Sequence, residues 1–144
     1  ALNSLRVEKA YGSWAREYRP VYGPLEAGLD RFVAYDKPAA FIGQAAAREE
    51  LVTGGKRRLR TFIVDTQRTD VIGDEPVWHG EKVCGWITSG GYAHASGVSV
   101  ALGYVEKELA DSEGPWSIEI LGQRFPARLQ RVPLFDADGK RQRG

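Results

Sequence analysis

The fold is decided by Lys82-Val83-Cys84-Gly85-Trp86-Ile87-Thr88-Ser89-Gly90-Gly91-Tyr92-Ala93-His94, followed by Ser99-Val100-Ala101-Leu102-Gly103-Tyr104-Val105. Val, Ile, Trp and Tyr favour a pleated, half-buried surface, so two strand-like runs flank a loop of small and polar residues. The glycine pair at 90–91 lets the backbone bend sharply or approach another group closely. Such a loop forms either the rim of a binding site or an ordinary broad turn, and both interpretations stay open on these residues alone.

Length, composition and charge restrict the class of protein. The chain has 144 residues, which suits one typical domain. Hydrophobic residues make up 42% and charged residues 27%, which is enough to bury a core and argues against global disorder. The 20 basic and 19 acidic residues leave a net charge of +1, so we expect neither a nucleic acid nor a membrane as partner.

The sulfur-containing residues bear on the compartment and on the completeness of the chain. Cys84 is the only cysteine, so an internal disulfide is impossible and a reducing compartment is expected. That compartment is the cytoplasm, or the mitochondrial matrix in a eukaryote. The sequence contains no methionine, and Ala1 opens directly into a patterned segment. We therefore expect a piece cut from a longer polypeptide.

Several short strands are predicted between about residue 57 and residue 135. The run Leu59–Asp65 is a strand candidate, and a tight hairpin turn is expected at residues 79–81. A second hairpin is expected at Gly122-Gln123, where glycine in the first central position fits a type II′ turn. Pro126 cannot donate to a ladder and is expected at an edge or a bulge. This spacing favours a small antiparallel barrel or a sandwich.

The first fifty or so residues have a different pattern. A short helix is expected near residues 2–10, a single helical turn at Pro24–Leu29, a strand at Arg31–Tyr35 and a helix at Gly43–Leu51. Residues 11–23 are aromatic and broken by Gly and Pro, which predicts a loop. This region is too short to form a core alone, so we expect it to pack on the β module, on missing sequence or on another copy.

The residues with reactive side chains form no recognised catalytic or metal-binding pattern. His79, Cys84 and His94 lack the close spacing of zinc ligands, so no metal site is predicted. Cys84 lies between Val83 and Gly85, where cysteine usually fills space in a strand. Ser89 is not in a G-x-S-x-G nucleophile elbow, which argues against a hydrolase triad with His94.

Two groups of residues have both a structural and a binding interpretation. Lys56-Arg57-Arg58 and Arg60 form a basic cluster, which is either a solvated strand entrance or a contact for an anion. An aromatic group in the first segment can stack on a flat heterocycle, although core or interface packing is at least as common; it comprises Tyr11, Trp14, Tyr18, Tyr22 and Tyr35.

Five ordered motifs resemble one family. They are Ala1-Leu2-Asn3-Ser4-Leu5-Arg6-Val7-Glu8-Lys9, Pro24–Leu29, Phe41-Ile42-Gly43, Gly85–Gly90 and Ala101–Val105. In this order they resemble the glycine-cleavage T-protein (aminomethyltransferase) family over nearly the whole chain. The similarity is greatest to the C-terminal folate region of dimethylglycine and sarcosine dehydrogenases.

The resemblance implies an α+β architecture and a place in one-carbon metabolism. Residues 1–55 would be the end of a folate-binding domain, residues 56–136 a small antiparallel β-barrel, and residues 137–144 a flexible tail. The parent would be an enzyme that passes a one-carbon unit from a small N-methyl or aminomethyl donor to tetrahydrofolate. FAD would bind in a missing N-terminal domain of a dehydrogenase member, and the fragment alone would be inactive.

The resemblance assigns one cofactor-binding residue and no catalytic residue. The family's essential aspartate lies N-terminal to this chain, and metal ligands are not implied. Just after Pro24–Leu29 the family places an aromatic residue against folate, and this chain has Arg31 there. A guanidinium group can also stack on a ring, so Arg31 is the predicted folate contact.

Two other functions remain open at this point. The chain can be a non-catalytic structural or interaction module, which would self-associate through the apolar surface of its first segment. It can also be a divergent anion binder that uses Arg31 and the basic cluster at residues 56–60.

Overall fold

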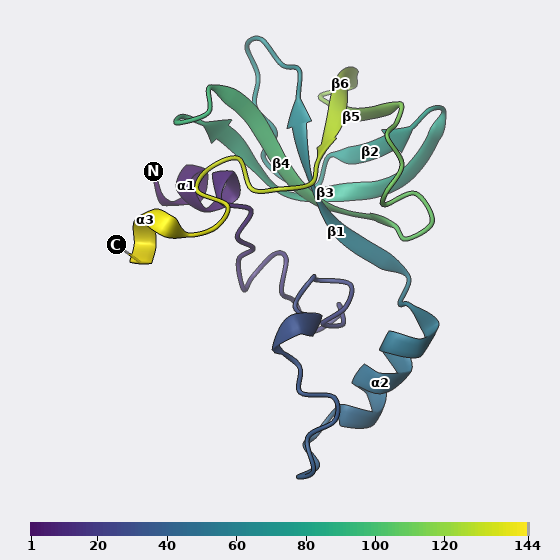
Figure 1. Ribbon diagram of the computed structural model, residues 1–144. Coiled ribbons are helices and arrows are strands. Elements are labelled where there is room, and N and C mark those ends of the chain that lie inside the picture. The colour runs from purple at the N-terminus through teal and green to yellow at the C-terminus, as the bar shows by residue number, and fades with distance from the viewer. Residues whose placement is uncertain (144) are drawn as a thin grey trace.

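A closed six-stranded β-barrel makes up most of the chain (Figure 1), as seen in a computed structural model that describes residues 1–143. Neighbouring strands are antiparallel in the order β1-β4-β3-β2-β5-β6, and β6 closes on β1. The bounds are β1 Arg57–Val64, β2 Pro76–His79, β3 Lys82–Ala93, β4 Val98–Glu106, β5 Trp116–Ile120 and β6 Gln123–Gln130. The predicted small antiparallel barrel is thus confirmed.

The segment Thr88–Tyr92 is part of strand β3 and is not the loop that the sequence predicts. β3 runs unbroken to Ala93 and pairs with β4, with one bulge between Ile87 and Ser89. The prediction was wrong because the glycine at position 90 is needed for close packing and does not mark a turn. A Cβ on Gly90 would lie 2.4 Å from the Val71 carbonyl oxygen, so the loop between β1 and β2 can pack against β3 here only if residue 90 is glycine.

The hairpin between β5 and β6 turns one residue earlier than predicted. Its central residues are Leu121 and Gly122, both with positive φ (50° and 80°), which fits a type I′ rather than a type II′ turn. Pro126 lies within a closed barrel, which has no edge strand. It sits just beyond the Val64–Ala127 pair that ends the β1–β6 ladder, where its carbonyl accepts from the N–H of Asp65.

Helix α1 (Leu2–Glu8) covers the outer face of β3 and β4. Val7 is fully buried there and packs with Ala93, Val100 and Leu102. The barrel interior is a separate apolar cluster that includes Phe62, Val64, Val71, Val77, Cys84, Ile87, Ala101, Val105, Ala110, Trp116, Ile118 and Ile120. The predicted N-terminal helix is confirmed, and it attaches the first segment to the barrel.

The first segment continues away from α1 as a smaller body beside the barrel, with helix α2 (Gln44–Thr53) at its far side (Figure 1). Gly43 and Gly54, both with positive φ, flank α2 and confirm the helix predicted there. The strand predicted at Arg31–Tyr35 is wrong. Asp30–Phe32 is instead a short 3₁₀ helix, η1, whose turns are closed locally and which pairs with no strand.

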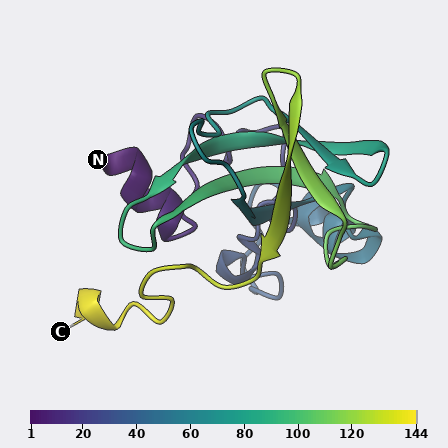
Figure 2. The ribbon, with the colours of Figure 1, turned by 90° about the horizontal axis from the view of Figure 1, so that it is seen from above.

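The C-terminal segment returns to α1. Lys9 donates to both the backbone and the carboxylate of Asp136, and Arg141 lies 5.1 Å from the centre of the Phe135 ring. A last short helix, α3, spans Lys140–Arg143. Helices α1 and α3 lie on the same side of the barrel (Figure 2). No helix among residues 1–143 has the length and apolar character needed to cross a membrane.

Candidate functional site

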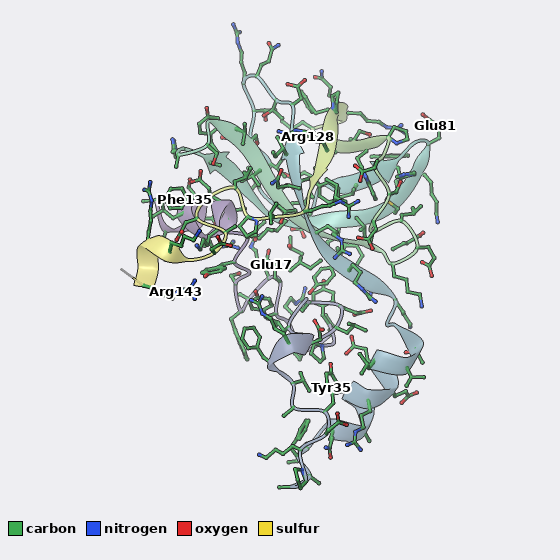
Figure 3. The ribbon with its side chains drawn as sticks, in the orientation of Figure 1. Glu17, Tyr35, Glu81, Arg128, Phe135 and Arg143 are labelled. Carbon is green, nitrogen blue, oxygen red and sulfur yellow. The ribbon has the colours of Figure 1, made fainter. Side chains whose placement is uncertain are left out.

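The buried carboxylate of Glu17 lies at the junction between the first segment and the barrel (Figure 3). Its Oε2 accepts from the Ser13 N–H at 2.7 Å and from Arg6 Nη1 at 3.3 Å. The Arg6 guanidinium also donates to the Ser89 hydroxyl on β3 at 2.8 Å. Three parts of the chain therefore meet in one buried polar cluster, formed by Arg6, Glu17 and Ser89.

The cluster keeps Glu17 ionised. Burial alone would raise the pKa of Glu17, but the Ser89 and Thr88 hydroxyls, the Ser13 N–H and the charge of Arg6 outweigh it and hold that pKa below its ordinary value. A carboxylate with a lowered pKa is a poor proton carrier at neutral pH. The arrangement therefore suits a fixed anchor between segments better than acid–base catalysis.

An aromatic stack lies beside this cluster. The Tyr22 and Tyr104 rings are stacked with centres 3.9 Å apart, and Arg57 lies 4.9 Å from the centre of the Trp86 ring. The Tyr104 hydroxyl donates to the Glu17 carbonyl at 2.7 Å. Tyr22, one of the aromatic residues considered for ligand stacking, is thus used to attach the first segment to the barrel.

An open hollow of about 840 Å³ lies between the Pro24–Leu29 turn, α2 and the start of β1. Its walls combine apolar side chains with three carboxylates and three basic groups. The residues lining it are Val21, Gly23, Pro24, Glu26, Val33, Phe41, Ile42, Gly43, Ala46, Ala47, Glu49, Glu50, Thr53, Gly55, Lys56, Arg57 and Lys107. Its size and mixed walls are typical of small-molecule sites.

Arg31, the predicted cofactor contact, lies on η1 at the surface. Its guanidinium lies 4.7 Å from the centre of the Phe32 ring, and Arg31 does not line the hollow, whereas Val33 does. A ring stacked on Arg31 would therefore have to come from the solvent side. The sequence prediction for Arg31 stays a prediction, because its surroundings neither require nor prevent a ligand.

The other candidate residues are apart from one another. Cys84 is inside the barrel, where burial raises the pKa of its thiol to about 11. His79 lies against Trp116 and the Ser112 hydroxyl, while His94 is on the β3–β4 turn beside Tyr92. Among residues 1–143, no three His, Cys, Asp or Glu side chains gather as a metal site would require.

The basic cluster at residues 56–60 is largely engaged by the chain itself. Arg58 donates to the Gly54 carbonyl at 2.7 Å, and Arg60 donates to the Ala110 carbonyl at 2.9 Å and to Asp111 at 3.0 Å. These contacts favour the structural interpretation of the cluster. Lys56 remains exposed at the rim of the hollow.

Glu17 was missed by reasoning from the sequence. The string Trp14-Ala15-Arg16-Glu17-Tyr18 has the composition of a surface loop, and a buried acid within it is not marked by any spacing rule. The sequence contains one indirect indication. Arg6 lies on a predicted helix and Thr88-Ser89 carries small hydroxyl groups, and each of these polar groups needs a hydrogen-bond partner when it is buried.

The barrel geometry agrees with a known family. Residues 57–136 match the family described as "Glycine cleavage T-protein C-terminal barrel domain". The chain belongs to this family. Its fold also matches the crystal structure of glycine cleavage system aminomethyltransferase T from Bartonella henselae, with a TM-score of 0.85 at 24% identity over 94% of this chain and 38% of that chain.

Longer relatives match residues on both sides of the barrel boundary. Mouse mitochondrial dimethylglycine dehydrogenase is 40% identical over 99% of this chain and 16% of its own length. The 4-methylaminobutanoate oxidase (formaldehyde-forming) of Paenarthrobacter nicotinovorans is 31% identical over 100% of this chain and 17% of its own length. Human mitochondrial sarcosine dehydrogenase is 28% identical over 100% of this chain and 16% of its length. The chain thus spans about a sixth of these relatives.

Proposed function

We propose that the chain is the C-terminal part of a tetrahydrofolate-dependent one-carbon transfer protein of the dimethylglycine or sarcosine dehydrogenase type. The observation that carries the proposal is the match to dimethylglycine dehydrogenase over 99% of this chain, including the whole first segment. In this proposal residues 1–55 end the folate-binding domain and the barrel closes beside them. Catalytic groups and an FAD site would lie outside these 144 residues.

The hollow beside the Pro24–Leu29 turn supports a folate ligand. Its apolar walls suit a flat ring, and carboxylates such as Glu49 suit the N–H donors of a pterin. Tetrahydrofolate, when bound, would supply the nitrogen that accepts the one-carbon unit. Arg31, which lies on η1 outside the hollow, would contact a part of the folate that extends from the hollow toward solvent. The donor would be a small N-methylated or aminomethyl amine, and the compartment the cytoplasm or the mitochondrial matrix.

Titration of the full-length protein with tetrahydrofolate tests this proposal. We expect saturable binding by the wild type, equal or tighter binding by Arg31→Tyr and weaker binding by Arg31→Ala. The control is Arg68→Tyr, the same change at an exposed arginine in the loop between β1 and β2. If neither the wild type nor Arg31→Tyr binds, the proposal is wrong.

A non-catalytic interaction module is the second candidate. The pyruvate dehydrogenase phosphatase regulatory subunit of mouse mitochondria is 33% identical over 93% of this chain and 17% of its own length, and its name is that of a regulator. Large apolar side chains of the first segment are also exposed, including Trp14, Phe32, Ile42 and Val52. Sedimentation tests this candidate, which predicts self-association of the 144-residue chain and no folate binding by the full protein.

A further inference from the structure

The carboxylate of Glu50 reaches from α2 to the Pro24–Leu29 turn. Its Oε1 accepts from the Glu26 N–H at 3.1 Å, and its Oε2 accepts from the Leu25 N–H at 3.3 Å. These N–H groups belong to the first residues of a helical turn, where backbone acceptors are lacking. One side chain of α2 thus satisfies two backbone donors of the turn.

The lack of a side chain at Gly23 leaves room for the Glu50 carboxylate. A Cβ at Gly23 would lie 2.2 Å from Glu50 Oε1 and 2.3 Å from Oε2, which is far inside van der Waals contact. Gly23 does not have a φ in the left-handed region. The carboxylate of Glu50, and not the backbone conformation, is therefore the reason that glycine is needed here.

The turn is held on its other side by the barrel. The carboxylate of Glu26 accepts from the N–H groups of Lys56 and Arg57 at 2.7 and 3.0 Å, and the Glu26 carbonyl accepts from the Leu59 N–H at 2.8 Å. Glu26 therefore fixes the turn to β1, while Glu50 fixes it to α2.

Apolar packing contributes little to the position of α2. Ala47 is the single residue that α2 buries. The helix also makes polar contacts, such as the bonds from Gln44 and Arg48 to the Tyr35 carbonyl at 2.6–3.0 Å. With so little buried apolar surface, the orientation of α2 relative to the turn depends on hydrogen bonds, and Glu50 supplies the two that reach the turn directly.

We propose that Glu50 is a positioning residue, whose carboxylate sets the Pro24–Leu29 turn and the following η1 for folate binding. The inference rests on the proposed folate function. Glu50 acts through the backbone of the turn and touches no reacting atom. Its loss leaves the Leu25 and Glu26 N–H groups to water and frees the turn to move relative to α2, so the folate-binding surface becomes less ordered before binding.

The test is tetrahydrofolate affinity of the full-length protein with variants at neighbouring positions of α2. Glu50→Ala is expected to raise the Kd about tenfold, as the loss of two backbone hydrogen bonds allows. Glu50→Gln, which keeps the shape and one acceptor oxygen, should recover part of the affinity. The control is Val52→Ala, because Val52 is an exposed residue of α2 that does not line the hollow and makes no bond to the turn; its Kd should stay within about twofold of the wild type.

A double-mutant cycle with Gly23 separates positioning from general loss of stability. Gly23→Ala should weaken folate binding by displacing the carboxylate, yet add nothing in the Glu50→Ala background. Equal Kd values for wild type and Glu50→Ala, with only a lower thermal midpoint, would leave Glu50 a purely structural role and overturn the inference. Additive effects of the two substitutions would overturn it as well.

Failure of the wild type to bind tetrahydrofolate would instead refute the proposed function. If Glu50→Ala does not fold, Glu50→Gln and Gly23→Ala answer the same question.

Discussion

Two Arg–Glu pairs of equal length allow a direct test of how burial stabilises this fold. The Arg6–Glu17 and Arg124–Glu81 pairs both measure 3.3 Å, but the Glu17 side chain is 0% exposed and the Glu81 side chain 92% exposed. Figure 3 shows Glu17 at the inner junction and Glu81 at the tip of the β2–β3 hairpin. We predict that Glu17→Gln destabilises the protein strongly and that Glu81→Gln hardly does.

The magnitude follows from the bonds at Glu17 Oε2. It accepts two hydrogen bonds, and a charged bond contributes about 1.5–3 kcal/mol against about 0.5–1.5 kcal/mol for a neutral one. Glutamine keeps the shape and loses the charge, so the free energy of unfolding should fall by about 2–3 kcal/mol. An exposed pair contributes at most about 1 kcal/mol, which bounds the effect of Glu81→Gln.

Urea unfolding at neutral pH, followed by tryptophan fluorescence, measures both changes. Similar losses for Glu17→Gln and Glu81→Gln would refute the reasoning, because distance alone would then decide the contribution of a pair.

The pH dependence of stability gives a second check. Because the pKa of Glu17 is lowered by folding, its ionised form adds stability above the ordinary glutamate pKa of about 4.3, and this stability is lost as the pH falls through the lowered pKa. Glu17→Gln should therefore make the acid limb of the stability profile shallower.

Three further predictions concern the barrel. Gly90→Ala should cost about 1–3 kcal/mol of unfolding free energy in urea titrations, because its Cβ meets the β1–β2 loop. Gly91→Ala, whose Cβ would lie 3.8 Å from Asn3 Nδ2 in ordinary van der Waals contact, should have little effect, and equal losses would contradict this. Tyr104→Phe should cost about 1–3 kcal/mol in the same assay, because it leaves the buried Glu17 carbonyl without its donor, and an unchanged midpoint would count against that bond. Cys84, with a thiol pKa of about 11, should react with a thiol reagent at pH 8 only after unfolding, so rapid reaction of the native protein would place it outside the barrel.

The barrel could be predicted from the sequence because its strands obey local rules. Alternation in Trp116–Ile120 and the turn glycines Gly80 and Gly122 specify hairpins without reference to the rest of the chain. The order of small residues in Thr88–Tyr92 does not follow such a rule. A glycine is equally compatible with a loop and with the close approach of another backbone segment. Which of the two applies at Gly90 depends on the Val71 carbonyl, which is distant in the sequence.

The junction could not be predicted for the same reason. Arg6, Glu17 and Ser89 come from three distant parts of the chain. The Pro24–Leu29 turn is likewise held by bonds to α2 and to the start of β1, whose partners lie 24–31 residues apart in the chain. Arg31–Tyr35 has the composition of a strand, yet no neighbouring strand is available to pair with it, so the chain closes its bonds locally in η1. Tertiary partners decided each of these cases.

Hydrogen exchange of the full-length protein with and without tetrahydrofolate tests the central claim most directly. The account predicts that folate slows exchange at the Pro24–Leu29 turn, η1 and α2, where the hollow lies. The β5–β6 hairpin lies at the opposite end of the molecule from α2 in Figure 1 and lines no part of the hollow, so its exchange should not change and serves as the internal reference. Unchanged exchange throughout residues 24–53 at saturating tetrahydrofolate would contradict a folate-binding role for this chain.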